Sequence, residues 1–438
     1  MTPVTIVGGG WAGLAAAVEL TSHRIPVTVF EAAGQLGGRA RTVEVNRYRI
    51  DNGQHLMLGA YHEMLRLMHI VGVNEEDVFD RLPLELFMTG LRTTPVRISL
   101  PRQPAPLHLV SGLYRATGIK FSEKMDLVRL CTSLLLRRDT TDRDISLAQW
   151  LEQHRQPDSL RQRLWEPLCL ATMNTPLDEA STRLFLRVMR DVFTRQSRDA
   201  DLLLTRRDLG AVFPEPAGRY VEAHGGTIRM KHRVNALRIS EYAISAVSVA
   251  HQNVLSDHVI LAVPPSTCHR LLAPHPILLP LAETIGAIPA APICTIYIQY
   301  ASGTTLGRPL IGLVDTTAQW MFDRARNGQA GLMAVVISGA GNHMDADKKT
   351  LAETVIREMA LLFPHWPPPV DWHVIREKHA TFVARPEVNA MRPANRTPVR
   401  GLWLAGDYTA TGYPATLEGA IRSGIAAARG VMQESGAA

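Results

Sequence analysis

A glycine-rich loop near the start of the chain has the residue types and spacing that bind a dinucleotide pyrophosphate. It follows the pattern GxGxxG over residues 8–13. The first glycine permits a tight turn, the second lets the backbone approach a phosphate, and the third lets the next helix pack closely on the preceding strand. The N-terminus of that helix also stabilises phosphate charge. The residues expected to bind the cofactor here are Gly8, Gly10, Trp11, Ala12 and Gly13.

The segments on both sides of this loop have the character that such a site requires. Residues 3–7 are apolar and predict a buried parallel strand, and residues 14–20 predict a helix. Residues 27–30 predict a second strand, which ends at Glu31, 18 residues after Gly13. A carboxylate at that position accepts hydrogen bonds from a ribose diol and repels a 2′-phosphate. The first 31 residues therefore predict a βαβ dinucleotide-binding unit.

Three further motifs indicate a flavin through a resemblance to a flavoprotein superfamily. The runs GGRART (37–42), LAGDYT (404–409) and ATLEGA (415–420) resemble motifs of the amine oxidase and phytoene desaturase superfamily. The resemblance implies that FAD is the cofactor, and that the helix beginning near residue 416 directs its positive end at the flavin ring, where charge develops on reduction. The residues that it adds to the FAD site are Gly38, Arg39, Val234, Gly406, Asp407, Thr416, Leu417 and Glu418.

A finer resemblance, to the hydroxysqualene dehydroxylase family within that superfamily, covers nearly the whole chain. Its motifs are DNGQHLMLGAY at 51–61, WEPLC at 165–169, NTP at 174–176, DLLL at 201–204 through FP at 213–214, and PATLEG at 414–419. The resemblance implies FAD-dependent reductive dehydroxylation of hydroxysqualene to squalene in C30 isoprenoid and hopanoid biosynthesis. In that reaction the reduced flavin delivers a hydride to an allylic carbon.

Three other activities are weighed against this one. A carotenoid or phytoene-type desaturase runs hydride transfer in the opposite direction, with the same FAD site and a long apolar cavity. A non-catalytic flavoprotein scaffold in a lipid-synthesis complex is an alternative of another class. Amine oxidation is disfavoured because Thr416 stands where amine oxidases commonly have an aromatic residue, and because residues 293–297 lack the lysine that they commonly carry near the flavin.

Loss of a hydroxyl group requires an acid or a hydrogen-bond donor, and His55 is the first candidate. Its ordinary pKa suits proton transfer near neutrality. Asp51 either orients His55 or caps a turn, and the cap is the preferred interpretation. Gln54 completes the set of candidate catalytic residues. A structural histidine that bonds the backbone or the flavin is the competing interpretation of His55.

The remaining composition narrows the class of protein. The four cysteines lie far apart without a CxxC pair, and the spacing of His55, His62 and His69 is not that of a metal pair on a helix, so no metal site is expected. A net charge of +6 with only 6% aromatic residues does not favour nucleic-acid binding. No uninterrupted run of about 20 apolar residues predicts a membrane-spanning helix.

These observations lead to expectations about partners and location. The expected partners are a lipophilic C30 isoprenoid substrate, a membrane surface, NADPH or a redox protein as electron donor, and other squalene-pathway enzymes. The expected location is the bacterial cytoplasm, with peripheral contact to the cytoplasmic membrane. The Leu- and Arg-rich stretch 104–207 is interpreted either as a lipid-contacting substrate domain or as a helical cap with solvated arginines.

The predicted fold is α/β, with a Rossmann-like FAD-binding domain of the amine oxidase and phytoene desaturase type, a mixed-sheet substrate domain and a helical, membrane-associating cap. The expected segments are 1–66, 203–264 and 395–438 for FAD binding, 67–202 for the helical cap and 265–394 for the substrate domain. Within the cap, Thr175-Pro176 predicts a helix start, because threonine is a good N-cap and proline fits the first helical position.

Overall fold

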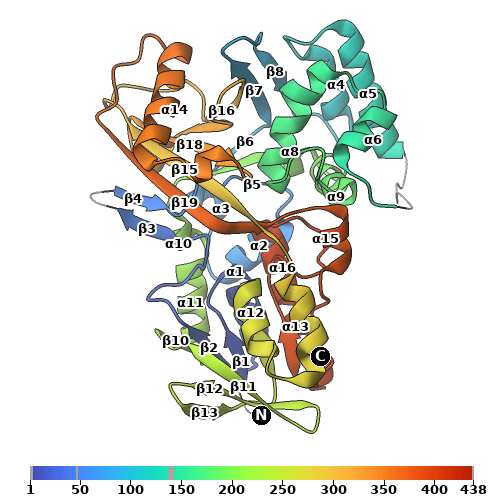
Figure 1. Ribbon diagram of the computed structural model, residues 1–438, viewed down its shortest axis with the longest axis vertical. Helices are drawn as coiled ribbons and strands as arrows, with labels where there is room; N and C mark the ends of the chain where they lie inside the picture. Colours follow the sequence, from blue (N-terminus) through green and yellow to red (C-terminus); the bar gives the residue numbers. More distant parts are fainter. Residues whose placement is uncertain (1–2, 46–47, 137–142, 437–438) are drawn as a thin grey trace.

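The computed structural model describes residues 3–45, 48–136 and 143–436. A five-stranded parallel sheet forms the lower half of the molecule in Figure 1, in the order β10-β2-β1-β14-β20. Its strands are β1 (Val4–Val7), β2 (Val27–Glu31), β10 (Thr227–Met230), β14 (Val259–Leu261) and β20 (Leu402–Leu404). The sheet therefore joins three segments that lie far apart in the sequence.

Helices cover this parallel sheet because its strands are apolar on both faces. Helix α1 (Trp11–Ser22) packs against α16 (Leu417–Glu434) and α11 (Pro214–Ala223). Eleven of the twelve residues of α1 are buried, which its alanine- and leucine-rich sequence allows. A separate antiparallel sheet consists of β11 (Val234–Ser240), β12 (Ala243–Val249) and β13 (Gln252–Leu255).

A seven-stranded mixed sheet occupies the upper half, in the order β19-β15-β18-β17-β16-β7-β8. Only the β16–β7 pair is parallel among the pairs of this sheet. Its strands are β7 (Glu85–Gly90), β8 (Val96–Ser99), β15 (Ala290–Gln299), β16 (Leu310–Val314), β17 (Trp320–Asp323), β18 (Leu332–Ser338) and β19 (Asp371–Phe382). Helix α14 (Lys348–Leu362) packs on β19.

A group of helices lies beside this sheet, at the upper right of Figure 1. They are α4 (Leu107–Arg115), α5 (Phe121–Leu136), α6 (Leu147–Gln153), α7 (Asp158–Leu160), α8 (Glu166–Met173) and α9 (Thr182–Phe193). The remaining elements are β3 (Thr42–Val45), β4 (Tyr48–Asp51), β5 (Met57–Leu58), β6 (Phe79–Leu82), β9 (Leu202–Thr205), α2 (His62–Ile70), α3 (Glu75–Val78), α10 (Leu209–Val212), α12 (Pro265–Leu272), α13 (Leu279–Gly286) and α15 (Pro386–Met391).

The predicted βαβ unit is confirmed in detail, and one predicted helix start is wrong. The strand, the helix and the second strand occur as β1, α1 and β2. No helix begins at Pro176, because the backbone beyond it bonds to other segments: Ser181 N donates to Ala384 O, and Leu147 N donates to Ala180 O. Helix α9 begins instead at Thr182, where the Ser181 hydroxyl accepts from Leu184 N.

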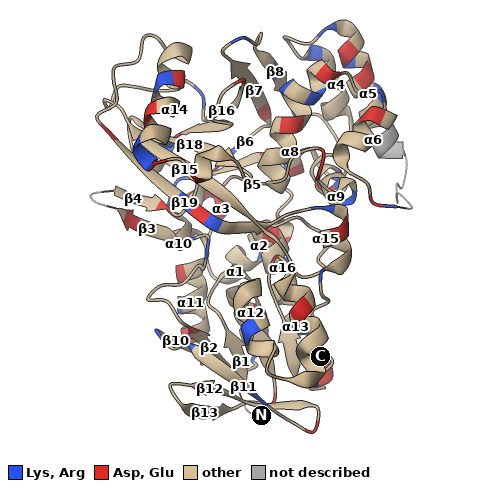
Figure 2. Cartoon of the chain, in the orientation of Figure 1, with Lys and Arg blue, Asp and Glu red and all other residues tan. Residues whose placement is uncertain are grey.

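Basic and acidic residues are interspersed over the molecule in Figure 2, and neither kind is gathered in one region of the view. Within residues 3–45, 48–136 and 143–436, no helix combines the length and the apolar character needed to cross a lipid bilayer.

Candidate active site

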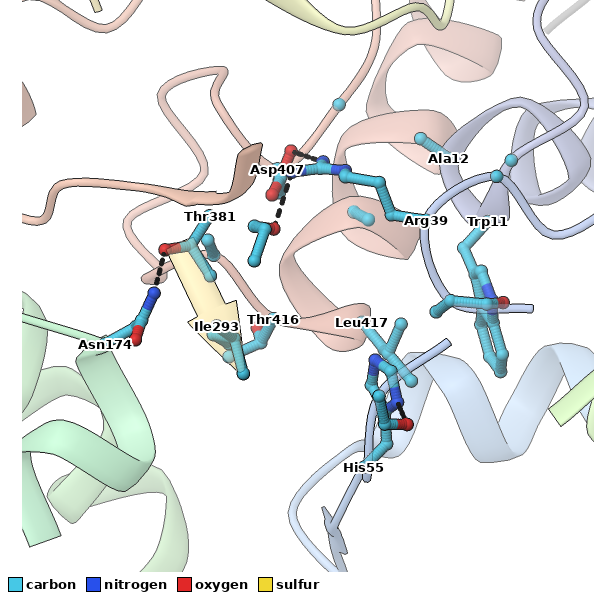
Figure 3. A pocket seen from close by; sticks show the side chains of 18 of the residues that line it. Trp11, Ala12, Arg39, His55, Asn174, Ile293, Thr381, Asp407, Thr416 and Leu417 are labelled. Carbon is cyan, nitrogen blue, oxygen red and sulfur yellow. Dashed lines mark hydrogen bonds and ion pairs between the residues drawn. The ribbon is translucent and has the colours of Figure 1, made fainter. Parts of the chain in front are cut away.

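One large cavity, with a volume of about 740 Å³, lies where the parallel sheet meets the seven-stranded sheet and the helices α8 and α9. Its wall changes character from one end to the other. The glycine loop, the end of β2 and residues 405–408 supply backbone and charged groups, whereas α8, α9 and the strands β16–β18 supply mostly apolar side chains. Figure 3 shows side chains from both ends directed toward the same open space.

The glycines of the loop serve two purposes. Some are needed because a side chain would clash with the protein backbone, and one is needed because a side chain would enter the cavity. A Cβ atom on Gly8 would lie 2.3 Å from Ala262 O, and one on Gly13 would lie 1.9 Å from Gly8 O. A Cβ on Gly10 would meet only Gly38 Cα, at an ordinary 3.7 Å, and the φ of Gly10 is −78°. Gly10 therefore leaves space in the cavity wall rather than relieving a clash. A backbone that a pyrophosphate must approach has this property.

The start of α1 completes the phosphate-binding arrangement. No side chain caps the N-terminus of α1, and its first turn carries no acidic residue. Its positive end therefore faces the cavity with its first backbone N–H groups uncapped by a side chain. The Trp11 indole donates to Ala40 O at 2.9 Å and packs against Phe213, so it anchors the loop, while Trp11 and Ala12 line the cavity.

Glu31 lies at the end of β2, where the sequence predicts the ribose contact. Its Oε2 accepts from Gly9 N at 2.7 Å and its Oε1 accepts from Ala33 N at 2.6 Å. These bonds fix the carboxylate at the cavity wall, and each oxygen retains lone-pair capacity for a diol. Val234, which begins β11, lies on the same wall and is buried.

Arg39 and Asp407 come from opposite ends of the chain and form an ion pair at the cavity. Arg39 Nη2 donates to Asp407 Oδ1 at 2.6 Å, and Arg39 Nη1 donates to Ala380 O at 2.8 Å (Figure 3). Gly38 and Gly406 both line the cavity and both have positive φ, +62° and +152°. The Arg39–Asp407 ion pair thus connects the GGRART motif (37–42) to the LAGDYT motif (404–409).

Helix α16 begins at the cavity, as predicted. Thr416 is its N-cap, with Oγ1 accepting from Gly419 N at 3.0 Å, and Thr416 and Leu417 line the cavity. Glu418 does not line it: its buried carboxylate accepts from Glu63 N, Met64 N and Arg422. The Glu418 side chain therefore joins α16 to the start of α2, and burial raises its pKa.

The apolar end of the cavity is a chamber built by helices and strands together. Its aliphatic and aromatic lining residues include Leu58, Leu84, Leu86, Leu168, Val188, Met189, Val192, Phe193, Leu202, Leu310, Trp320, Phe322 and Val336. Ile293 of β15 and Thr416 stand on the wall at the boundary with the polar end (Figure 3). Thr416, where amine oxidases commonly have an aromatic residue, and Ile293, from the stretch 293–297 that lacks their lysine, thus both border this cavity.

The three candidate catalytic residues lie close in sequence but differ in exposure to the cavity. His55 and Gln54 line it, whereas Asp51 does not. Asp51 Oδ1 accepts from the N–H of Leu209, the first residue of α10, at 3.0 Å, and its Oδ2 lies 3.6 Å from Arg324 Nη1. Burial raises the pKa of Asp51, and the Arg324 charge opposes this shift.

The hydrogen bond of His55 fixes its tautomer. His55 Nδ1 lies 2.9 Å from Gly53 O (Figure 3), and because a carbonyl only accepts, Nδ1 carries the hydrogen. Nε2 is then unprotonated in the neutral ring. Burial lowers the pKa of His55 below 6.5, and the charge of Asp51 partly opposes this shift.

Two charged residues near the cavity had no signal in the sequence. Arg324, at 2% exposure, donates to Gln54 Oε1 at 2.7 Å and to Gln329 Oε1 at 2.6 Å, so it holds Gln54 in place. Asp191 of α9 lines the apolar chamber and lies 3.2 Å from Arg187 Nε. Arg324 directly follows β17, and Asp191 lies in the arginine-rich helix α9. In the sequence both resemble ordinary surface charges, and only the tertiary structure shows that they are buried.

Other chemistry is limited among the described residues. Within the part of the chain that the structure describes, no group of three or more His, Cys, Asp or Glu residues is arranged to hold a metal ion. Cys131, Cys169, Cys268 and Cys294 are free and buried.

Residues 11–432 match the family described as flavin containing amine oxidoreductase. The chain belongs to this family. The chain is 30% identical to hydroxysqualene dehydroxylase of Rhodopseudomonas palustris, with 97% of each chain covered. Relatives with that name are 28–30% identical over nearly the whole chain, so the predicted resemblance is confirmed. The probable zeta-carotene desaturase of Synechococcus elongatus is 23% identical, with 98% of each chain covered.

Solved structures give the same fold. An oxidoreductase from Methanosarcina mazei has a TM-score of 0.76 and 14% identity, with 99% of this chain and 100% of that chain covered. The predicted α/β fold of the amine oxidase type is confirmed, and this member of the amine oxidoreductase family is an FAD-dependent oxidoreductase. The glycine loop, Glu31 and the uncapped start of α1 fit FAD, since they offer space, a diol acceptor and a positive helix end. The residue-by-residue FAD contacts, the catalytic roles and the domain boundaries stay predictions.

Proposed function

We propose that this enzyme removes the hydroxyl group of hydroxysqualene and yields squalene, within C30 isoprenoid and hopanoid biosynthesis. The observation that carries the proposal is the single cavity that joins the FAD site to a chamber of aliphatic and aromatic side chains. A long hydrocarbon fits such a chamber, whereas a charged amine would lose its hydration there. The wall also has Thr416 where amine oxidases commonly have an aromatic residue, and Ile293 from the stretch 293–297 that lacks their lysine.

The reaction replaces a C–O bond by a C–H bond, and the hydroxyl leaves as water after gaining a proton. When bound, reduced FAD supplies the hydride for the new C–H bond. The protein must bind the hydrocarbon, assist the departing hydroxyl and exclude water from the allylic cation. The apolar chamber serves the first and third of these tasks.

His55 is the proposed proton donor to the departing hydroxyl. In its neutral form Nε2 can only accept, so the acid role requires a proton on Nε2. The lowered pKa makes that protonated form scarce at neutral pH, and a rate that depends on it increases as the pH falls. Gln54, held by Arg324, lies next to His55 and can bond a hydroxyl oxygen from the same wall.

Asp191 is proposed to stabilise the developing positive charge on the allylic carbons. It is 7% exposed and is the acidic residue that α8 and α9 contribute to the cavity wall in the described chain. A carboxylate in an apolar chamber interacts with a cation more strongly than it would in water. Its partner Arg187 lies 3.2 Å away, and the Arg187 side chain is 37% exposed, so water screens the charge of Arg187 more than that of the buried carboxylate.

The electron donor is proposed to be NADPH or a redox protein that reduces the flavin before the substrate binds. Anaerobic mixing of the oxidised enzyme with NADPH, and separately with a reduced redox protein, distinguishes the two. Bleaching of the flavin band within the turnover time identifies the donor, and a slower change excludes that donor.

The function is tested by product analysis. Reduced enzyme and detergent-dispersed hydroxysqualene are expected to give squalene by mass spectrometry, in an amount that follows the enzyme concentration. In a parallel assay, the oxidised enzyme is mixed with an unhydroxylated C30 or C40 polyene, and a desaturated product is sought. Desaturation of the polyene without formation of squalene would replace the proposal by a carotenoid-type desaturase, and turnover of neither substrate would favour a scaffold.

A further inference from the structure

Exposed apolar side chains gather on one pair of helices beside the active-site chamber. Of the ten large hydrophobic side chains that are exposed among the described residues, four lie on α4 and α5. They are Leu107 (61% exposed), Tyr114 (66%), Phe121 (67%) and Met125 (41%). We call these four residues the α4–α5 patch.

Helix periodicity and the close approach of the two helices bring the residues of the α4–α5 patch to neighbouring faces. Leu107 and Tyr114 are seven residues apart on α4, and Phe121 and Met125 are four apart on α5, so each pair shares a helix face. Lys124 Nζ donates to Tyr114 O at 3.0 Å, so the first turn of α5 lies against the end of α4.

The opposite faces of the same helices line a second, smaller cavity. Leu109 and Leu113 of α4 and Leu127 and Cys131 of α5 border this cavity, which has a volume of about 70 Å³. It shares five lining residues with the main cavity: Leu84, Leu86, Leu168, Met189 and Phe193. The helix pair therefore separates an exposed apolar surface from a small apolar cavity, and the five shared side chains form the wall between that cavity and the main one.

Cations surround the α4–α5 patch, and its acids are engaged within the protein. Arg115 and Lys120 are exposed, and Lys124 is half-buried. Glu123 is buried and accepts from Lys120 N, and Asp126 pairs with Arg129. Figure 2 shows both signs of charge on α5. Because the two acidic side chains already have partners within the protein, the charged groups that remain beside the apolar side chains are cationic.

We propose that the α4–α5 patch docks on an anionic lipid bilayer and that the space behind it admits an isoprenoid lipid to the active-site chamber. Exposed apolar side chains insert at the headgroup boundary while flanking lysine and arginine residues attract anionic headgroups. A bilayer also explains why both faces of the helix pair are apolar, since the lipid must pass from one side to the other. The identity of the admitted lipid rests on the proposed function, whereas docking does not.

Vesicle sedimentation of the FAD-loaded enzyme tests docking directly. The triple variant Leu107→Gln/Tyr114→Gln/Phe121→Gln is compared with Leu255→Gln/Tyr242→Gln/Leu361→Gln, which removes two leucines and a tyrosine that lie elsewhere on the surface and are 73%, 71% and 65% exposed. With phosphatidylglycerol/phosphatidylcholine vesicles, the first variant is expected to bind about tenfold or more weakly than the parent, and the second to bind as the parent does. Lys120→Gln/Lys124→Gln is expected to weaken binding about fivefold per charge and to reduce its dependence on salt.

Activity separates the portal from the chemistry. With substrate embedded in vesicles, the α4–α5 variant is expected to lose most turnover, and with substrate in detergent it should retain parental turnover and FAD content. Equal vesicle binding by the two triple variants would overturn docking. A change in oligomeric mass without a change in vesicle binding would also overturn it and identify an interface between copies. Failure of the parent to convert hydroxysqualene in detergent would instead contradict the proposed function.

Discussion

At the scale of single residues, the glycine loop separates the requirements of folding from those of cofactor binding. Gly10→Val is expected to fold normally and to be purified colourless, because its side chain enters the cavity rather than the protein interior. Gly13→Ala is expected to lower the free energy of unfolding by about 2–3 kcal/mol, because its Cβ would lie 1.9 Å from Gly8 O. Thermal unfolding and the flavin absorbance per protein measure the two effects.

A control for these variants is Gly303→Ala, where a Cβ meets nothing within 4 Å. It should keep both stability and FAD. A yellow Gly10→Val protein with full flavin content would contradict the position of the pyrophosphate.

His55 gives a pH dependence with a definite sign. Its pKa lies below 6.5, so the protonated fraction increases as the pH falls from 8 toward the lowered pKa. If protonated His55 is the acid, kcat increases as the pH falls and levels off once the pH is below the pKa of His55. His55→Gln should lose most activity and this pH dependence, while His251→Gln, at an exposed histidine, should keep both. An unchanged pH profile in His55→Gln would assign the proton to another group.

At the scale of elements, helix α9 determines where the chamber carries charge. Asp191→Asn keeps the shape of the side chain and removes its charge, so turnover is expected to fall between about tenfold and a hundredfold with FAD retained. Asp158→Asn changes an exposed acid that pairs with Arg161 and is the matched control. Steady-state kinetics with detergent-dispersed substrate measures both, and equal rates for the two variants would remove Asp191 from the mechanism.

Helix α16 has a second task besides directing its N-terminus at the cavity. Glu418 connects it to α2 through two backbone amides and has no exposure to solvent. Glu418→Gln replaces one acceptor by a donor, so the free energy of unfolding is expected to fall by about 1–3 kcal/mol. The folded variant should still bind one FAD, as measured by its absorbance. Loss of FAD at unchanged stability would instead support the predicted contact of Glu418 with the cofactor.

The same elements show what the sequence could and could not predict. Strands β1 and β2 and the loop between them were predictable because their pattern is local and apolar on both faces. The pairing of β7 with β16 was not, because it joins residues more than 200 positions apart without a local signal. The helix predicted at Pro176 failed because backbone bonds to residues 147 and 384 replaced helical ones. Asp191 was missed because a single acid in an arginine-rich helix indicates a solvated face.

At the scale of the whole molecule, three distant segments build one sheet, and several further segments close the cavity above it. Residues 4–31, 227–261 and 402–434 supply the FAD half, and α8, α9 and the seven-stranded sheet supply the apolar half. The Arg39–Asp407 ion pair joins the stretch between β2 and β3 to the last of these segments, at a separation of 368 residues. FAD binding is therefore expected to stabilise the whole chain, because its predicted site is built by residues from all three segments.

That coupling is measurable by thermal unfolding with and without the cofactor. Removal of FAD is expected to lower Tm by several degrees, and re-addition should restore it in a concentration-dependent manner. An identical Tm for the apo and FAD-loaded proteins would contradict a cofactor site shared by the three segments.

The most direct test of the proposed reaction is an anaerobic single turnover. The flavin is reduced, excess reductant is removed, hydroxysqualene is added in detergent, and the oxidised flavin band and squalene are followed together. We predict that the band returns at the rate at which squalene forms, with one squalene for each flavin oxidised. A reduced flavin that stays bleached with hydroxysqualene, together with bleaching of the oxidised enzyme by a polyene, would contradict reductive dehydroxylation and reverse the direction of hydride transfer.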